Sequence, residues 1–305
     1  MNLHLIIKMK FRRVVVLDNP KKTLPSGWNV ALREYKGDAI IKVDAHAVIP
    51  EDFVSKNVRV LETGEYICGG QRPNIIDKPT PFKETLLLAE SSMFGSSIAS
   101  YRNNPGKTYV KSLFHAAYRR EVFEKVGFFN EELVRTEDNE IHYRMRKAGY
   151  KLCFDPDIIS YQYTRSSLKA MLKQKYANGY WIGKTSKVCP KCLSIYHFVP
   201  FAFVSAIIAS GSVIGATGLA ECIKKRHNHT LGKGISALRK VTVVLTTVMW
   251  VLYALMASGM AAVSAFKAED KRNITNACLP VLFLLLHLSY GIGTIAGLMD
   301  KSKRG

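Results

Sequence analysis

Three long runs without Asp, Glu, Lys or Arg constrain this 305-residue chain more than any other feature of its sequence. They cover residues 198–220, 241–266 and 277–299. Each run is long enough to cross about 30 Å of hydrocarbon as a helix that rises about 1.5 Å per residue. Three such runs within the last 108 residues favour a membrane-embedded region over buried core helices.

The charge distribution indicates a soluble region ahead of these runs. Residues 1–197 carry 32 basic and 20 acidic side chains, whereas 198–305 carry 12 basic and 4 acidic ones, for a net charge of +20. We therefore expect a soluble domain over 1–197 and a membrane region over 198–305. The apolar content of 48% excludes a disordered chain, and six cysteines over this length exclude a disulfide scaffold. No nucleic-acid partner is expected, because no recognised binding motif accompanies the positive charge.

Basic residues beside the apolar runs bear on orientation. Residues 221–240 hold six of them and the tail holds three, while 267–276 holds three that two acidic residues partly offset. Cytoplasmic segments tend to be the basic ones, and residues 1–13 contain only a short apolar patch, too short for a signal peptide. We therefore expect a cell-membrane protein with a cytoplasmic soluble domain, a re-entrant or interfacial first run that its Gly and Pro residues could break, and two crossing runs joined outside by 267–276. Three full crossings are the alternative.

Alternating apolar and amphipathic stretches in the soluble domain predict an α/β fold. Strands are expected at 13–17, 37–43, 66–69, 152–154 and 158–161. Helices are expected at 24–35, 55–62, 120–126 and 137–148, and the last two end at Gly127 and Gly149.

Asp44 and His46 form the pair with the clearest chemistry, at the end of the expected strand 37–43. Folds of the α/β class present ligand-binding groups at the carboxyl ends of their strands. A carboxylate and an imidazole two residues apart can both turn towards one divalent cation. The alternative for an isolated Asp-x-His pair is an aspartate that caps a turn.

The chain also carries an ordered series of short motifs. The first group is Asp18-Asn-Pro20, Gly27-Trp-Asn29, Lys36-Gly-Asp38 and Val43-Asp-Ala-His-Ala47. The second group is Ala117-Tyr-Arg-Arg-Glu121, Val126-Gly-Phe-Phe-Asn-Glu131, Thr136-Glu-Asp138, Ala148-Gly-Tyr150, Asp155-Pro156 and Arg165-Ser-Ser167. In this order the motifs resemble family-2 glycosyltransferases, in particular bacterial succinoglycan-type membrane glucosyltransferases of exopolysaccharide biosynthesis.

This resemblance implies a glycosyltransferase-A-type, Rossmann-like α/β domain followed by transmembrane helices. It implies an inverting transfer of a sugar from a nucleotide-diphosphate donor, a UDP-sugar, to a lipid-linked saccharide acceptor. By resemblance, Asp44 and His46 hold a divalent cation, Mn²⁺ or Mg²⁺. Asp138 is the catalytic base, and Glu137 positions a neighbouring group. The donor-binding positions are Asp18, Asn29, Asp44, Gly69 and Gly70.

Two departures from the family pattern leave alternatives open. Residues 174–181 lack the Arg of the Gln-x-x-Arg-Trp motif of processive synthases, so transfer of a single sugar is expected. The chain begins near the end of the family's first nucleotide-binding unit, so we expect an N-terminally truncated domain. The alternative function is a truncated, catalytically inactive glycosyltransferase-like membrane protein.

Two further features have structural alternatives. Gly69 and Gly70 either let backbone approach a sugar or merely bend a strand. Cys189 and Cys192 have zinc-knuckle spacing without a second cysteine pair, so a structural role is expected for them.

Overall fold

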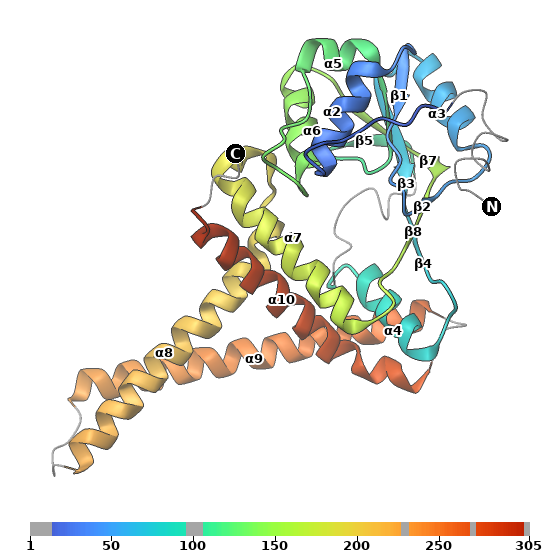
Figure 1. Cartoon of the computed structure of the whole chain (residues 1–305). Helices are drawn as coiled ribbons and strands as arrows, with labels where there is room; N and C mark the ends of the chain where they lie inside the picture. The colour runs from blue at the N-terminus through green and yellow to red at the C-terminus, as the bar shows by residue number, and fades with distance from the viewer. Residues whose placement is uncertain (1–13, 96–105, 227–231, 269–272, 302–305) are drawn as a thin grey trace.

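Five strands form the central sheet of the N-terminal domain, in the order β1-β6-β3-β7-β5 (Figure 1). The computed structural model describes residues 14–95, 106–226, 232–268 and 273–301. The strands are β1 (Ala39–Ile41), β3 (Ile67–Gln71), β5 (Thr108–Val110), β6 (Ala116–Arg119) and β7 (Leu152–Ile159). Both β1 and β3 run antiparallel to β6, and β3 runs parallel to β7. The carboxyl ends of β1, β3 and β7 therefore meet the amino end of β6 at one edge of the sheet.

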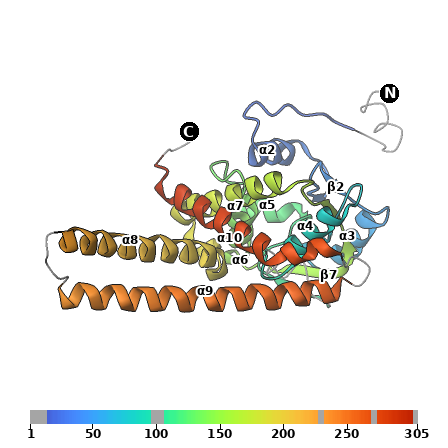
Figure 2. The ribbon, with the colours of Figure 1, turned by 90° about the horizontal axis from the view of Figure 1, so that it is seen from below.

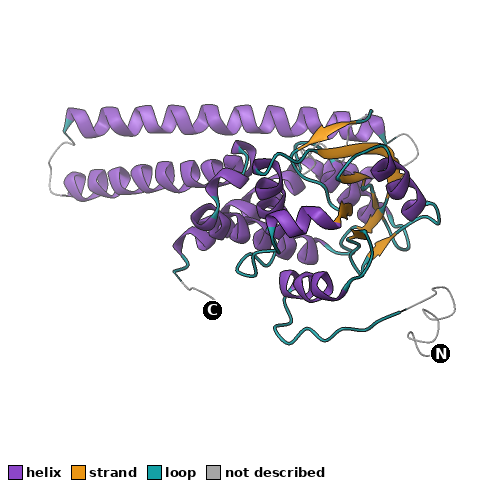
Figure 3. Ribbon diagram, turned by 90° about the horizontal axis from the view of Figure 1, so that it is seen from above, coloured by secondary structure: helices purple, strands orange, loops and turns teal. Residues whose placement is uncertain are grey.

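A second, three-stranded sheet continues from that edge, in the order β2-β8-β4. Its strands are β2 (Ala47–Val48), β4 (Asn74–Ile75) and β8 (Tyr161–Tyr163). Each follows a strand of the central sheet after a few residues. Figure 3 shows that all strands lie in one part of the molecule, and that the two long helices project from the other side.

Helices cover both faces of the central sheet because its buried side chains alternate between two apolar cores. Ile67, Tyr118 and Phe154 point into one core, against α2 (Leu24–Glu34), α5 (Arg120–Val126) and α6 (Glu137–Lys147). Their neighbours in the strands, Cys68, Ala117 and Cys153, point into the other core, against α3 (Phe53–Glu62). The mixed α/β fold expected from the sequence is confirmed, and the four predicted helices are present within two residues at either end.

The strand predicted at 13–17 is wrong for residues 14–17, and Arg13 lies outside the described residues. This segment is extended but has no strand assignment, and Val15 and Val16 are 57% and 74% exposed. A strand needs a hydrogen-bonding neighbour, and β-branched residues alone do not supply one. The strand predicted at 152–154 and the first half of the one predicted at 158–161 form a single strand, β7, and Tyr161 begins β8. Pro156 is tolerated inside β7 because the register with β3 shifts there.

The C-terminal helices begin with α7 (Leu168–Val188), which packs along α10 (Leu279–Met299). The two helices run in the same direction: the hydroxyl of Ser289 donates to the carbonyl of Leu172, and Gly297 lies against Tyr180. Glycines permit this approach, because a Cβ on Gly179 would lie only 1.9 Å from the Tyr290 carbonyl oxygen. The sequence reading did not include α7 or α4 (Pro81–Ser91), which also contacts α10.

The other two long helices, α8 (Val199–Arg226) and α9 (Lys233–Lys267), lie side by side and extend away from the sheet domain (Figure 2). Short 3₁₀ turns precede or follow them: η2 (Pro190–Cys192), η3 (Ile195–Phe198) and η5 (Ile274–Cys278). By length and composition, three helices can cross a membrane: 195–224, 233–267 and 274–299. The expectation of a broken first run is wrong, because α8 is continuous over 28 residues.

The segment between α9 and α10 lies on the sheet domain's side of the molecule. Its described residues, 273–276, bond to α4: Thr85 donates to the side-chain oxygen of Asn276 over 2.8 Å, and Thr275 donates to the Pro81 carbonyl over 3.1 Å. Residues 269–272 lie outside the described part of the chain. These contacts place residues 273–276 beside α4, and the location of 267–276 relative to the membrane stays a prediction.

Candidate active site

Lys42 occupies the centre of a buried charged cluster at the carboxyl edge of the central sheet. It directly follows β1, and its backbone N–H donates to the Ala116 carbonyl, which fixes its position beside β6. Its Nζ atom lies 2.5 Å from Oδ1 of Asp138 and 3.7 Å from Oε1 of Glu137. Only 6% of the Lys42 side chain is exposed. Such a burial of charge is stable only when opposite charges are close.

The two carboxylates of this cluster belong to the first turn of α6, where the helix dipole favours negative charge. Arg144 on the same helix anchors it, because its guanidinium donates to the carbonyls of Val126 and Phe128 over 2.7 and 2.6 Å. The Asp138 side chain remains 17% exposed, whereas that of Glu137 is 4% exposed. Asp138 is therefore the carboxylate that a bound molecule can reach.

Burial and mutual repulsion set the ionisation of this cluster. Burial raises the pKa of Glu137 from 4.5 to about 8, the Asp138 charge adds to this effect, and Lys42 opposes it. Burial also raises the pKa of Asp138, again against the attraction of Lys42. Although burial disfavours the charged amine, Asp138 and Glu137 raise the pKa of Lys42 above its ordinary value. At neutral pH Lys42 is therefore charged, and the Glu137-Asp138 pair retains a proton.

Asp44 lies at the same edge, two residues beyond Lys42. Its Oδ2 atom is 3.8 Å from Nε2 of His115, which immediately precedes β6. Burial alone would raise the pKa of Asp44, but His115 and Lys42 outweigh burial and hold this pKa below its ordinary value. Three buried atoms here have no hydrogen-bond partner: Asp44 Oδ1, His115 Nε2 and Glu137 Oε2.

These unsatisfied atoms suit a divalent cation, since they are carboxylate oxygens and an imidazole nitrogen. Among the described residues, no group of three His, Cys, Asp or Glu side chains converges on one point. Mg²⁺ and its relatives usually take only one or two protein ligands at sites shared with substrate phosphates. Asp44 therefore fits the cation that its motif implies.

His46 lies farther along, at the small sheet, and is exposed. Its Nε2 atom is 2.7 Å from the side-chain nitrogen of Gln162, so that the Gln162 amide donates to it across β2 and β8. It is close enough to Asp44 to lower the pKa of that carboxylate slightly, after the larger effects of burial, His115 and Lys42.

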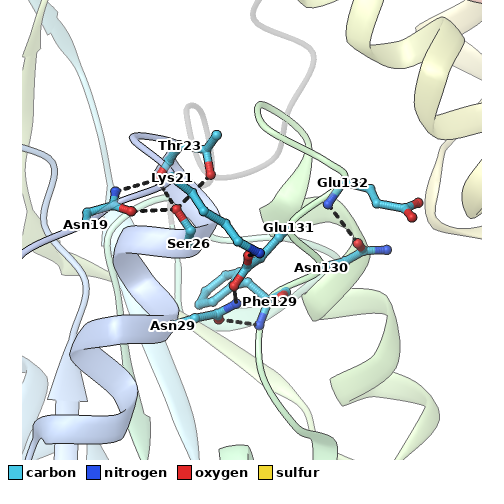
Figure 4. Close-up of polar contacts among 9 residues, drawn as sticks. All are labelled: Asn19, Lys21, Thr23, Ser26, Asn29, Phe129, Asn130, Glu131 and Glu132. Carbon is cyan, nitrogen blue, oxygen red and sulfur yellow. Dashed lines mark hydrogen bonds and ion pairs between the residues drawn. The ribbon is translucent and has the colours of Figure 1, made fainter. Parts of the chain in front are cut away.

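Asn29, predicted to contact a donor, joins α2 to the loop ahead of α6 (Figure 4). Its Nδ2 atom donates to the Phe129 carbonyl and to Glu131, and its Oδ1 atom accepts from the Phe129 backbone N–H, each over 2.9 Å. Lys21 donates to the other oxygen of Glu131. Asn29 thus ties the first motif group to the second, and its contact with a donor stays a prediction.

The remaining predicted donor positions differ in their surroundings. Asp18 is exposed on the extended segment ahead of α2. Gly69 and Gly70 are buried in β3, where a Cβ would lie 2.9 Å from the His115 carbonyl oxygen and 2.0 Å from that of Ile158 respectively. The close packing of β3 against β6 and β7 therefore explains both glycines, and their approach to a sugar stays a prediction.

Sequence reasoning missed Lys42 and His115, the two side chains that complete the cluster. The available signal for Lys42 was a basic residue at the end of an apolar strand, two positions before Asp44. His115 had no local signal, because its relation to Asp44 exists only through the pairing of β1 with β6.

Comparison with known families accounts for this arrangement. The family model described as glycosyl transferase family group 2 matches residues 39–293, which include the whole cluster, α8, α9 and most of α10. The chain belongs to this family. The family-2 resemblance inferred from the sequence is thus confirmed, and the three long apolar helices expected after the sheet domain are present.

Relatives of this family-2 chain act in glycan synthesis. The succinoglycan biosynthesis protein ExoA of Rhizobium meliloti (strain 1021) is 28% identical over 172 residues, 55% of this chain and 51% of that protein. A dolichyl N-acetyl-alpha-D-glucosaminyl phosphate 3-beta-D-2,3-diacetamido-2,3-dideoxy-beta-D-glucuronosyltransferase of Methanococcus voltae is 23% identical, over 66% of this chain and 64% of that protein. The O-antigen chain rhamnosyltransferase RfbN of Salmonella typhimurium is 29% identical over 42% of each chain. The chain thus spans between two fifths and two thirds of the length of these relatives.

Proposed function

We propose that this protein is an inverting glycosyltransferase that moves one sugar from a nucleotide-diphosphate donor to a lipid-linked saccharide acceptor. The observation that carries the proposal is the convergence of Asp44, Glu137 and Asp138 around Lys42 at the carboxyl edge of the sheet. The family match and the names of the relatives support the reaction class.

Asp138 is the proposed base that removes a proton from the attacking acceptor hydroxyl. Its side chain is accessible, and its raised pKa makes it a stronger base than an ordinary aspartate. Glu137 is proposed to hold the proton of this pair, which leaves the negative charge on Asp138, and to position it. Lys42 orients Asp138 and neutralises its charge before substrates bind.

The donor diphosphate is proposed to lie next to Asp44, where a divalent cation offsets the charge that develops on the departing nucleotide. Mn²⁺ and Mg²⁺ both match the available oxygen and nitrogen donors. A UDP-sugar is the proposed donor class.

The acceptor side is proposed to lie near Arg135 and Arg165. The two guanidinium groups are close enough to repel each other, and Glu137 attracts Arg135. A pair of arginines beside the base suits the phosphate groups of a lipid-linked acceptor.

We further propose that the sheet domain is cytoplasmic and that α8 and α9 cross the cell membrane as a hairpin. Only 6% of the most apolar window of either helix is buried inside the protein, compared with 39% for α10. α10 is tied to the sheet domain's side at both ends: by η5 to α4, and by Asp300, which pairs with Lys184 of α7. α10 is therefore proposed to lie along α7 at the membrane surface.

The test is sugar transfer in membranes that contain the full chain, with a panel of nucleotide-sugars and lipid-linked acceptors. Asp138→Asn should lower the rate about 10²–10⁴-fold while donor binding is nearly unchanged, because a general base contributes about that factor. Asp157→Asn, at an exposed aspartate away from the cluster, is the matched control and should keep the wild-type rate. Transfer by Asp138→Asn within a few-fold of wild type would refute this role. Donor binding without transfer across the panel would instead favour the inactive alternative.

A further inference from the structure

His115 is a buried histidine for which the proposed transfer reaction has so far no use. The residue is 3% exposed, and its ring lies where the ends of β1, β3, β6 and β7 meet. Its Nε2 atom is buried without a hydrogen-bond partner and is 3.8 Å from Oδ2 of Asp44. A buried imidazole nitrogen without a partner is unfavourable unless a ligand satisfies it.

The other ring nitrogen of His115 determines what Nε2 can do. The Nδ1 atom is 2.8 Å from Oγ of Ser160, and the Ser160 hydroxyl itself donates to the Gln71 carbonyl. With its own proton directed at Gln71, Ser160 can accept the proton of His115 Nδ1. In that tautomer the Nε2 atom carries a lone pair that a cation beside Asp44 can use, in place of the Nε2–H that faces the carboxylate when no cation is bound. Histidine ligands of metals generally have this arrangement, with the second ring nitrogen donating to the protein.

The distance between the two ligand atoms allows both to contact one cation. An ion with ligands at about 2.1 Å can contact two atoms at once when they lie within about 4.2 Å of each other, and adjacent octahedral ligands lie about 3.0 Å apart. The observed 3.8 Å is below the upper limit and is too long for a hydrogen bond. A shift of about 0.8 Å therefore brings the two atoms to adjacent positions. Asp44 also has its second oxygen, Oδ1, buried without a partner. Water and donor phosphates can fill the other positions.

His46 is placed differently from His115. It is exposed, and its Nε2 atom already accepts from Gln162. We propose that His115, and not His46, is the nitrogen ligand that joins Asp44 at the divalent cation of the proposed transfer reaction. Ser160 is then the residue that positions the His115 ring. This inference rests on the proposed function only in requiring a cation at Asp44.

The experiment measures Mn²⁺ binding to the full detergent-solubilised chain by electron paramagnetic resonance, with UDP as the diphosphate probe. His115→Ala should weaken Mn²⁺ binding at least 10-fold, and Ser160→Ala should weaken it several-fold, because such supporting residues affect metal affinity. His46→Ala should stay within about 3-fold of wild type. Asp44→Asn is the positive control for the cation site itself.

A pulsed measurement supplies a direct signature, the modulation that a coordinated nitrogen imposes on the Mn²⁺ signal. We expect this modulation in wild type and in His46→Ala, a substitution at an exposed position that the fold tolerates. If the nitrogen modulation is absent from His46→Ala, the proposal is overturned. This outcome does not depend on whether His115→Ala folds. Binding that Asp44→Asn abolishes but His115→Ala leaves intact would also overturn it, without affecting the proposed transfer, which Asp138→Asn tests separately.

Discussion

The Nζ atom of Lys42 lies 2.5 Å from Oδ1 of Asp138, and this contact joins the end of β1 to the start of α6 across 96 residues of sequence. It brings together the two halves of the proposed site, the cation-binding Asp44 and the proposed base. Only 6% of the Lys42 side chain is exposed, so solvent cannot replace its charge.

Loss of this amine should therefore destabilise the sheet domain. Lys42→Met keeps the length of the side chain but leaves Asp138 and Glu137 without a counter-charge, which should cost about 3–5 kcal/mol. The measurement is thermal unfolding followed by tryptophan fluorescence, since the Lys42 amine lies 5.5 Å from the centre of the Trp28 ring. Lys42→Arg, which retains the charge, is the control and should lose less stability than Lys42→Met. Equal stability of Lys42→Met and wild type would show that the pair contributes nothing to the fold.

Glu137 should make the stability of the domain fall as the pH rises. Its pKa is about 8 in the folded protein and ordinarily 4.5, so the folded state holds an extra proton between these values. Stability from this group is complete below about pH 4.5 and is lost as the pH rises through 8, by at most about 1.4 kcal/mol per pH unit. Glu137→Gln cannot ionise, so its free energy of unfolding should rise relative to that of wild type as the pH is raised from 5 to 8. Parallel unfolding profiles for the two proteins over this range would contradict the assigned protonation.

His142 should make the stability of the domain fall as the pH is lowered. Burial, followed by the charges of Lys42 and Arg146, lowers the pKa of His142 from 6.5 to about 3. Between these pH values the histidine is therefore protonated in the unfolded chain and neutral in the folded one. Stability is complete above about pH 6.5 and declines as the pH falls towards 3. His142→Gln keeps a group that can bond to Tyr118, which lies 2.8 Å from Nε2 of His142, but does not titrate. Its unfolding temperature should fall less than that of wild type between pH 6.5 and 5.

The glycines between α7 and α10 should tolerate no side chain. A Cβ on Gly179 would lie 1.9 Å from the Tyr290 carbonyl oxygen, so Gly179→Ala should separate the helices and lower the unfolding temperature by several degrees. Gly259→Ala in α9 is the matched control, because nothing lies within 4 Å of its added Cβ. It should be neutral or slightly stabilising, since alanine is the better helix former. Equal effects of the two substitutions would refute close packing of α7 on α10.

The hairpin topology can be tested with single cysteines at positions 229, 270 and 303, in a background without the native cysteines. Labelling of intact cells with an impermeant maleimide should modify position 229 alone, because both ends of α10 contact elements on the sheet domain's side. This arrangement exports the basic loop against the usual charge preference. Labelling at 270 alone would restore the orientation that loop charge favours, and the contacts of Thr85 with Asn276 would then not exist in the membrane.

The sequence by itself determined the features that depend on neighbouring residues. The glycines after α5 and α6 and the acidic first turn of α6 are local signals, so both helices and the Glu137-Asp138 pair at the start of α6 could be predicted. The three apolar helices followed from their lengths alone. The family followed from the order of short motifs, which requires no knowledge of contacts.

Only the tertiary structure decided which side chains meet. Lys42 reaches Asp138 and His115 reaches Asp44 because β6 runs antiparallel to β1, a pairing that no local pattern encodes. The same limit explains one error and one contact that loop charge does not indicate. Residues 14–17 have the composition of a strand but no neighbour to bond to, and the segment before α10 has the charge of an outer loop yet hydrogen-bonds to Thr85. Propensity and charge act locally, whereas strand pairing and helix docking depend on groups that are brought together only when the chain folds.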